Sequence, residues 1–458
     1  MSKLERQPLV GKYKPYPEYK DSGVEWLGKI PSHWAIKKIA WYFKAQKGRN
    51  AQMLTKEFCG ENPGDFPVYS GQTENDGVMG SINSYEFDSA QDGCLFATTV
   101  GAKAMTLSFL KGKFSLSQNC MVITPTSDVI DTRFYFYHCQ PLFSYERGLI
   151  PEHMQASFRM EDLYQYQIAM PNLQEQQTIA AFLDYETARI DWLIAQQQRL
   201  IELLKEKRQA VISHSVTKGL NPDVPMKDSG IEWLGQVPEH WAVMRLKHLI
   251  KSLESGCSVN AADVPAKEDE LGVLKTSCVY TRRFRASENK TVVMEDFSRV
   301  KCPVRKGAII ISRMNTPELV GASALVDTDA SNLFLPDRLW QTIFNDQFEV
   351  NPEFLAHFMT VEGFRNQISL SAEGASSSMQ NIAKEDYLAI NALLPLLEEQ
   401  IEIVDYIKES EARFLRLEAQ AMNAIELMKE RRIALISAAV TGKIDLRGWT
   451  PPAEEAAV

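Results

Sequence analysis

The chain of 458 residues carries one stretch of sixteen residues twice. The first copy, KDSGVEWLGKIPSHWA, runs from Lys20 to Ala35, and the second, KDSGIEWLGQVPEHWA, runs from Lys227 to Ala242. Twelve of the sixteen positions are identical. An internal repeat predicts two copies of one structural unit, so the fold has to be sought in the half-chain first.

A second repeated block closes each half. PNLQEQQTIAAFLDYETARI begins at Pro171 and PLLEEQIEIVDYIKESEARF begins at Pro395. The match resumes as ELLKEKRQAVISHSVT from Glu202 and ELMKERRIALISAAVT from Glu426. Each half therefore has a shared front edge, a dissimilar middle and a shared back end. Near-copied ends indicate one structural job done twice, and dissimilar middles indicate one kind of job done on two targets.

The back ends have the pattern of long helices. Apolar residues follow seven-residue tracks, which start at Ile179 and Leu183 in the first half and at Ile403 and Ile407 in the second. Sustained heptads favour a coiled coil, and the other copy is the obvious partner, packed antiparallel. Asn172 and Glu175 fit an N-cap with a capping-box partner. Plain core helices of a larger domain are the alternative.

The middles favour strands. Short apolar runs such as CLFATTV and GAIIIS alternate with turn residues, and helices are expected at RFYFYHCQPLF from Arg133 and at NPEFLAHFMTVEGFRNQI from Asn351. The predicted fold class is α+β, with two pseudo-two-fold related mixed α/β globular domains joined by two long helices packed as an antiparallel coiled coil. The predicted segments are 1–170 (first domain), 171–224 (long helix), 225–394 (second domain), 395–446 (second long helix) and 447–458 (disordered tail).

Composition narrows the class of protein. No stretch of about 18 apolar residues and no apolar signal core at the start predict a cytoplasmic protein. Seven scattered cysteines without a C-x-x-C pair predict buried free thiols rather than disulfides or a zinc cluster, and no other pattern indicates a metal site. The sequence also contains no G-x-x-x-x-G-K-[ST] motif of a phosphate-binding loop, and no cofactor is expected in this chain.

The net charge of −9 hides local basic segments. Residues 275–313 contain ten basic and three acidic residues, and residues 93–127 contain three lysines and no acid. Basic side chains among Tyr, Ser, Thr and Asn suit phosphate contact and base-edge recognition, although a solvated surface is the alternative for each. Candidate DNA-binding residues of the first half are Ser70, Gln72, Thr73, Lys103, Lys111, Lys113, Gln118 and Gln155. Those of the second half are Lys275, Arg282, Arg283, Arg285, Arg313, Asn315, Ser377, Ser378 and Gln380. Arg313 and Asn315, just after the AIIIS run, are the first choice for base contact.

The ordered set of motifs resembles the specificity subunits of type I restriction–modification systems. The carrying motifs are the P-x-H-W strings that end at Trp34 and Trp241, the P-x-L-x-E-Q strings that start at Pro171 and Pro395, and the helix ends KEKRQAVISHSVTKG and KERRIALISAAVTGK. No single motif is decisive, but the duplicated order is specific and covers about Tyr19 to Asp445.

The resemblance implies that each middle is a target-recognition domain for one half of a bipartite, asymmetric sequence of double-stranded DNA. The long helices would space the domains and dock two methyltransferase subunits, which use S-adenosylmethionine, and restriction subunits would join them. The chain itself would be non-catalytic. Expected partner-binding residues are Glu175, Gln176, Arg189, Glu399, Gln400 and Arg413.

The repeated His-Trp pairs need a separate interpretation. His33 with Trp34, and His240 with Trp241, are expected to be structural, each Trp anchoring a domain to the helical stem while its His forms a hydrogen bond. Two other functions are alternatives to DNA recognition. A duplicated coiled-coil scaffold that binds only proteins would leave the dissimilar basic middles unexplained, and a stand-alone enzyme would have to act without partners.

Overall fold

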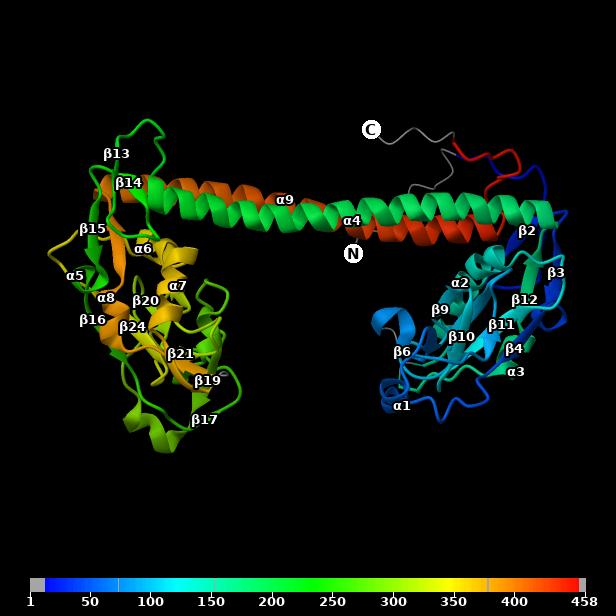
Figure 1. Ribbon diagram of the computed structural model, residues 1–458, viewed down its shortest axis with the longest axis horizontal. Helices are drawn as coiled ribbons and strands as arrows, with labels where there is room; N and C mark the ends of the chain where they lie inside the picture. The colour runs from blue at the N-terminus through cyan, green and yellow to red at the C-terminus, as the bar shows by residue number, and fades with distance from the viewer. Residues whose placement is uncertain (1–12, 73, 152, 377–378, 453–458) are drawn as a thin grey trace. The chain divides into compact units, whose positions relative to one another are not determined.

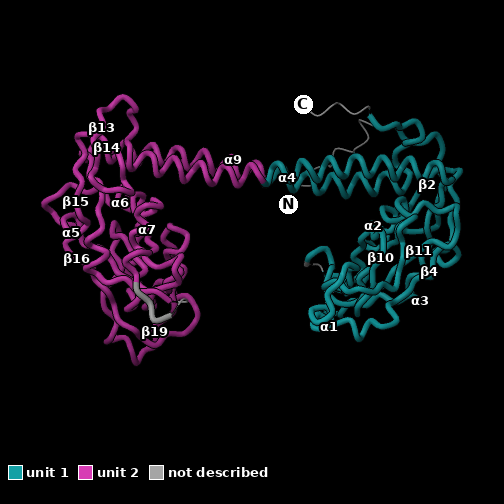
Figure 2. Tube along the Cα trace, in the orientation of Figure 1, with its two compact units in different colours: residues 1–198, 422–458 teal, residues 199–421 magenta. Residues whose placement is uncertain are grey.

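The computed structural model describes residues 13–72, 74–151, 153–376 and 379–452 (Figure 1). The chain divides into two compact units (Figure 2). Unit 1 comprises residues 1–198 and 422–458, and unit 2 comprises residues 199–421. Each unit contains one sheet-rich domain and a portion of both long helices, α4 (Leu173–Lys218) and α9 (Leu397–Val440). The mixed α/β fold class with two long helices is therefore confirmed.

The shared front edge of each half is a β-hairpin with the same register. In unit 1, β1 (Tyr19–Asp21) pairs antiparallel with β2 (Lys29–Pro31), and in unit 2, β13 (Met226–Asp228) pairs with β14 (Gln236–Pro238). The KDSG string is the same in both copies because Gly23 and Gly230 adopt φ values of 69° and 72°, which disfavour residues with a side chain.

A second short pairing joins the front edge to the start of each long helix. In unit 1, β3 (Ala35–Lys38) pairs with β12 (Gln167–Met170), which immediately precedes α4. In unit 2, β15 (Ala242–Arg245) pairs with β27 (Asn391–Leu394), which precedes α9. The repeated ends of the sequence are therefore neighbours in space within each unit.

The middle of unit 1 forms two four-stranded sheets. One has the strand order β4-β11-β8-β9 and the other β6-β5-β10-β7. Their strands are β4 (Phe43–Gln46), β5 (Phe66–Tyr69), β6 (Val78–Ile82), β7 (Phe87–Asp88), β8 (Cys94–Thr98), β9 (Leu107–Leu110), β10 (Lys113–Leu116) and β11 (Cys120–Pro125). The accompanying helices are η2 (Ile39–Trp41), α1 (Lys56–Glu61), η3 (Glu74–Gly77), α2 (Thr132–Gly148) and α3 (Met160–Gln165).

Helix α2 connects the first sheet to the helix pair. It packs against β8 and β9, and Tyr137 on its other side donates a hydrogen bond to Asp184 of α4 at 2.7 Å (Figure 1). The helix expected from Arg133 is thereby confirmed, and the side chain of Asp131 caps its first turn.

The main sheet of unit 2 repeats the plan of unit 1, because β16, β24, β20 and β22 take the places of β4, β11, β8 and β9 with the same antiparallel pairings. The strand orders in the middle of unit 2 are β16-β24-β20-β22, β17-β19-β18-β23 and β21-β26-β25. The strands are β16 (Ile250–Ser255), β17 (Ala261–Ala262), β18 (Gly272–Leu274), β19 (Asn289–Val292), β20 (Ile309–Ser312), β21 (Met314–Asn315), β22 (Ser323–Leu325), β23 (Leu333–Phe334), β24 (Leu339–Phe344), β25 (Glu373–Ser376) and β26 (Met379–Asn381). The helices are α5 (Leu246–Leu249), η4 (Thr276–Val279), η5 (Met294–Arg299), α6 (Pro352–Phe358), α7 (Glu362–Ser371) and α8 (Lys384–Ala389).

One expected helix of unit 2 is in fact two. The helix predicted from Asn351 breaks between α6 and α7, and the break lets Val361 and Phe358 both turn into the core. Asn351 caps α6 through its side chain, so the predicted start is correct. The second helix, α7, carries Arg365.

The two long helices pack antiparallel within each unit. In unit 1, the first part of α4 shares a core with the last part of α9, and Arg432 forms an ion pair with Asp191 at 3.3 Å. In unit 2, Ile212 and Val216 of α4 share a core with Ile403 and Ile407 of α9. The predicted antiparallel pairing is confirmed.

The predicted heptad tracks are confirmed in part. Those that start at Leu183 and Ile407 stay buried or half-buried along their length, whereas those that start at Ile179 and Ile403 leave the seam. Leu200 and Leu417 on the latter tracks are 42% and 38% exposed. Buried or half-buried residues of α4 also recur every eleven residues, at Ile179, Ile190, Ile201 and Ile212. An eleven-residue spacing is 3.67 residues per turn, close to the natural helix period, so the seam drifts off a strict seven-residue track.

The chain ends and the cysteines differ in part from expectation. Residues 453–458 of the expected disordered tail lie outside the described residues, but Trp449 packs on Phe182 with ring centroids 5.5 Å apart, so that part of the expectation is corrected. All seven cysteines are free, and five are buried, whereas Cys257 and Cys302 are partly exposed. No helix among the described residues is both long and apolar enough to cross a membrane.

Candidate nucleic-acid interface

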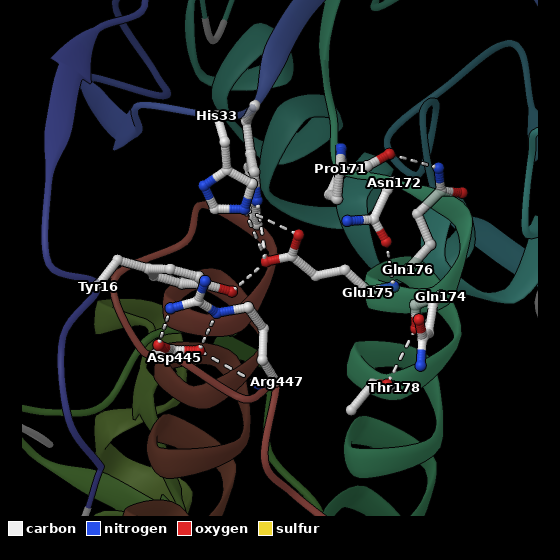
Figure 3. Close-up of polar contacts among 11 residues, drawn as sticks. Tyr16, His33, Pro171, Asn172, Gln174, Glu175, Gln176, Thr178, Asp445 and Arg447 are labelled. Carbon is white, nitrogen blue, oxygen red and sulfur yellow. Dashed lines mark hydrogen bonds and ion pairs between the residues drawn. The ribbon is translucent and has the colours of Figure 1, made fainter.

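Each long helix begins with a clasp that holds the front edge of its unit. Glu175, in the first turn of α4, accepts hydrogen bonds from Tyr16 Oη at 2.6 Å and from Trp34 Nε1 at 3.1 Å (Figure 3). His33 Nε2 lies 3.0 Å from its other carboxylate oxygen. The structural interpretation of the His-Trp pair is therefore confirmed in unit 1.

The capping-box expectation is only half correct. The side chain of Asn172 does accept from the backbone N–H of Glu175 at 2.9 Å and caps α4. The Glu175 carboxylate, however, points to the three front-edge side chains rather than back to Asn172 (Figure 3). Long-range donors outcompete the local one because they are buried and have no water to bind.

Unit 2 repeats the clasp with fewer donors. Glu399 Oε2 accepts from Trp241 Nε1 at 2.9 Å and lies 2.9 Å from His240 Nε2. No counterpart of Tyr16 is present, because Asp223 occupies the matching position. The Glu399 side chain is 26% exposed, against 3% for Glu175.

The glutamine next to each clasp glutamate ties down another helix. Gln176 donates to the carbonyl oxygens of Val129 and Pro171 and accepts from the backbone N–H of Asp131, the cap of α2. Gln400 does the same with Glu349, Pro395 and Asn351, the cap of α6. The repeated Glu-Gln string is therefore an internal fastening.

This geometry corrects four of the six expected partner-binding residues. Glu175, Gln176 and Gln400 are buried, and Glu399 is bound within its own unit, so their side chains have little surface left for a second protein. Arg189 and Arg413 are exposed on the long helices and stay predictions. Apolar side chains on α4 and α9 were missed; those of unit 1 that are at least 57% exposed are Trp192, Met422, Leu427 and Ile433.

In unit 1, the candidate DNA-binding residues lie on loops and strand ends. Lys111 and Lys113 flank the turn between β9 and β10, and Lys113 Nζ lies 4.5 Å from the ring centroid of Tyr85. Gln72 and Gln118 are exposed and adjoin a backbone hydrogen bond from Gly71 to Gln118, which brings their two loops together. Lys103 and Gln155 are exposed on two further loops that a bond from Gly101 to Ala156 joins. Ser70 is buried, and Thr73 lies outside the described residues.

In unit 2, the basic segment is less positive than its sequence suggests. Six of its ten basic side chains form ion pairs: Lys275 and Lys290 with Asp263, Arg283 with Glu411, Arg285 with Glu288, Arg299 with Asp296, and Arg305 with Glu254. Three of these acids, Asp263, Glu411 and Glu254, come from outside the segment. Solvent-exposed pairs are weak, so a phosphate could displace such acids.

The small sheet β21-β26-β25 gathers several candidates. Its pairing sets Asn315 opposite Gln380, and Asn315 Nδ2 donates to Tyr280 Oη at 2.8 Å. Arg313 lies at the junction of β20 and β21, and its backbone oxygen accepts from Ile382 beyond β26. Ser377 and Ser378, between β25 and β26, lie outside the described residues.

Two arginines add positive charge in this unit. Burial and, to a smaller extent, the nearby charge of Arg282 together lower the pKa of Arg365 to about 10. Burial likewise lowers the pKa of Arg282. Arg365 donates to the carbonyl oxygen of Val320, in the loop after β21, at 2.6 Å. Sequence analysis missed Arg365, although an arginine within an otherwise apolar helix face was a usable signal.

Polar atoms without partners mark the same set of residues. Among the described residues, Arg282 Nη1, Arg313 Nε, Arg365 Nη1 and Gln380 Oε1 are buried and form no hydrogen bond within the chain. Buried polar groups are normally satisfied, so these four atoms are available to a ligand, as are six other buried atoms in the described ranges that include Trp340 Nε1 and Thr132 Oγ1. We name Arg282, Arg313, Asn315, Arg365 and Gln380 the arginine–amide set. Its guanidinium and amide groups are those that contact guanine and adenine edges.

Comparison with known proteins now adds a family. Residues 31–203 match the model of the type I restriction modification DNA specificity domain. The chain is 24% identical over 285 residues to the EcoKI specificity subunit of Escherichia coli K12, covering 60% of this chain and 57% of that one. It is 24% identical over 213 residues to the EcoEI specificity subunit of Escherichia coli, covering 46% and 35%. Over these ranges the chain is similar to type I specificity subunits.

Solved structures agree on the fold. A chain from work on complex assembly and conformational transition of the type I R-M system superposes with a TM-score of 0.64 at 14% identity, covering 90% of this chain and 98% of that one. The HsdS subunit from Thermoanaerobacter tengcongensis gives a TM-score of 0.51 at 15% identity, covering 91% and 98%. The alignments with the two Escherichia coli relatives span only about a third to just over half of those relatives.

The matched range, residues 31–203, covers the first middle of the chain. It includes His33, Trp34 and Glu175 of the clasp of unit 1 and the lysines of the β9–β10 turn, whereas Tyr16 precedes it. The repeat extends the same plan to unit 2, where the clasp recurs at Glu399. Among the described residues, no three side chains of the metal-ligating types lie together.

Proposed function

We propose that this chain is the DNA-recognition subunit of a type I restriction–modification complex, in which each recognition domain binds one half of a bipartite, asymmetric target. The match of residues 31–203 to a DNA specificity domain carries the proposal. The internal repeat supports a second domain of the same kind. The main sheets of the two units share one strand order while the sequences of the two middles differ, which suits two domains of one kind that bind different half-sites.

The long helices are the proposed docking surface for methyltransferase subunits. Trp192, Met422, Leu427 and Ile433 expose large apolar side chains on α4 and α9 of unit 1, and Leu200, Leu203, Leu415 and Leu417 do so in unit 2. Apolar side chains gathered on exposed helices favour contact with another protein. Restriction subunits would then join through the methyltransferases.

Catalysis belongs to the partners in this proposal. The methyltransferase subunits would bind S-adenosylmethionine, and this chain would hold no cofactor and act on DNA in the cytoplasm. The relatives it matches are specificity subunits, which supports a non-catalytic role.

A methylation map of the host genome, with and without this gene, tests the proposal. We expect one split motif, two short defined halves around a fixed gap, to lose its methylated adenine on deletion. An unchanged map, with the methyltransferase present and active elsewhere, would instead favour a scaffold that binds only proteins.

A further inference from the structure

A groove opens beside the end of α4 in unit 2. It has a volume of about 490 Å³ and lies between the last turns of α4, the loop that follows, and Tyr406 of α9. Ala210, Leu220, Pro222 and Tyr406 supply apolar surface, and Lys207 and His214 line it as well. The ring of Tyr406 is 44% exposed.

The same place in unit 1 is filled. Phe182, which the repeat aligns with Tyr406, is fully buried. The ring of Tyr13 packs edge-on against it at 5.4 Å between centroids, and the ring of Trp449 does so at 5.5 Å. Two aromatic side chains from the ends of the chain thus cover this aromatic position of the repeat.

Unit 2 lacks both of these rings for a simple reason. Aligning Pro15 with Pro222 places Leu220 where unit 1 has Tyr13. Trp449 has no counterpart, because the chain after α4 continues directly into β13. One short connection has to replace two separate terminal segments, and it leaves the groove uncovered.

We propose that the groove of unit 2 binds an aromatic side chain on an extended, proline-containing segment of a partner protein. In unit 1 the rings that cover Phe182, those of Tyr13 and Trp449, each lie two residues from a proline, Pro15 and Pro451. We take these two segments as the model for the segment that binds in unit 2. The charge of the groove refines it. Lys207 and His214 line the groove and none of its lining residues is acidic, so the segment carries acidic residues on either side of its aromatic residue, within a few positions of it.

A labelled peptide measures this directly. The probe is a fluorescein-labelled peptide with the sequence DLRGWTPPAEE, that of residues 445–455, titrated with the full chain in fluorescence anisotropy without DNA or other subunits. We expect saturable binding below about 1 mM, and binding weaker by at least about tenfold when alanine replaces the tryptophan of the peptide.

Two matched variants locate the binding. Ala210→Trp fills the groove, and we expect it to weaken binding at least about tenfold. Ala434→Trp changes the equivalent helix position of unit 1, where the aromatic position of the repeat, Phe182, already has its two rings, and should leave binding unchanged. Tyr406→Ala, which removes the groove's aromatic wall, should weaken binding as Ala210→Trp does.

The proposal fails if the peptide does not saturate, or if Ala210→Trp and Tyr406→Ala bind as well as the wild type. It also fails if mass photometry shows a dimer of the wild type that Ala210→Trp abolishes, because the groove then holds a second copy of this chain. Peptide binding needs neither DNA nor methylation, so its failure is distinct from failure of the DNA-recognition proposal.

Discussion

Replacing the clasp glutamate by alanine should destabilise unit 1 much more than unit 2. In unit 1, Glu175→Ala leaves the hydroxyl of Tyr16 and the indole N–H of Trp34 without an acceptor, and both residues are buried, at 3% and 0% exposure. A buried donor that loses its partner costs about 1–3 kcal/mol. Two such donors give a loss of about 4 kcal/mol.

The matched change Glu399→Ala strands only one buried donor, the indole N–H of Trp241. His240 is 43% exposed at its side chain, and water can replace its lost contact. The same truncation at equivalent positions of the repeat therefore costs about 1–2 kcal/mol in unit 2. The difference between the two losses of stability measures the contribution of the Tyr16 hydrogen bond and of the deeper burial of the clasp in unit 1.

Hydrogen exchange by mass spectrometry separates the two units, whereas a global melting curve would average them. We expect Glu175→Ala to speed exchange in peptides covering β1 and β2 by about a thousandfold, and Glu399→Ala to speed exchange over β13 and β14 by about tenfold. Equal acceleration in both hairpins would refute the claim that buried donors set the cost. No acceleration in either would show that the clasp does not hold the front edge.

Three further predictions concern pH, half-sites and docking. His138 is fully buried between the backbone of Val440 and that of Ala169, and burial lowers its pKa from an ordinary 6.5 to about 4. Because the unfolded chain binds the proton first, about 3 kcal/mol of stability should be lost as pH falls from 6.5 to 4. His138→Gln should flatten that part of a pH series of unfolding midpoints. Arg313→Ala or Arg365→Ala should weaken or change methylation at one half-site by about tenfold or more, whereas Lys113→Ala should affect the other half-site. If all three variants lose methylation at both half-sites equally, the arginine–amide set does not contact the bases. Ile433→Lys should weaken association with the methyltransferase at least about tenfold in mass photometry, because it places a charge in the proposed interface. Met53→Lys changes a similarly exposed residue away from the long helices and should leave association unchanged.

Sequence analysis predicted the parts of the fold that depend on local pattern. The long helices, most strand runs, the cap at Asn172 and the anchoring of Trp34 follow from periodicity, turn residues and the repeat. Only one of the two seven-residue tracks on each long helix follows the seam, because the other falls out of step with the helix period, at Leu200 in α4 and at Leu417 in α9. The break after α6 depends on which side chains the core of unit 2 has room for, and no local signal marks it.

The candidate site was harder to predict because its charges are balanced over long distances. Counting Lys275 to Arg313 as a basic surface ignored Asp263, Glu254 and Glu411, which the fold brings to that segment from elsewhere. Conversely, the arginines that keep buried, unpartnered atoms, Arg282 and Arg365, come from segments 83 residues apart (365 − 282). Only the packing around Tyr387, whose pKa burial raises, brings their charges within interaction range.

The division between repeated and unrepeated residues has a physical basis. Glu175 and Gln176 recur as Glu399 and Gln400 because they fasten the front edge and the first domain helix to the long helix, and that job depends on fixed backbone positions rather than on the ligand. The residues that differ lie on strands and loops beyond these fastenings, where a change alters the surface and leaves the clasp intact. A chain built this way can vary what each domain binds while keeping one mode of attachment. The repeated motifs therefore carry the resemblance to specificity subunits, whereas the residues that do not repeat are those that we propose to bind the two half-sites.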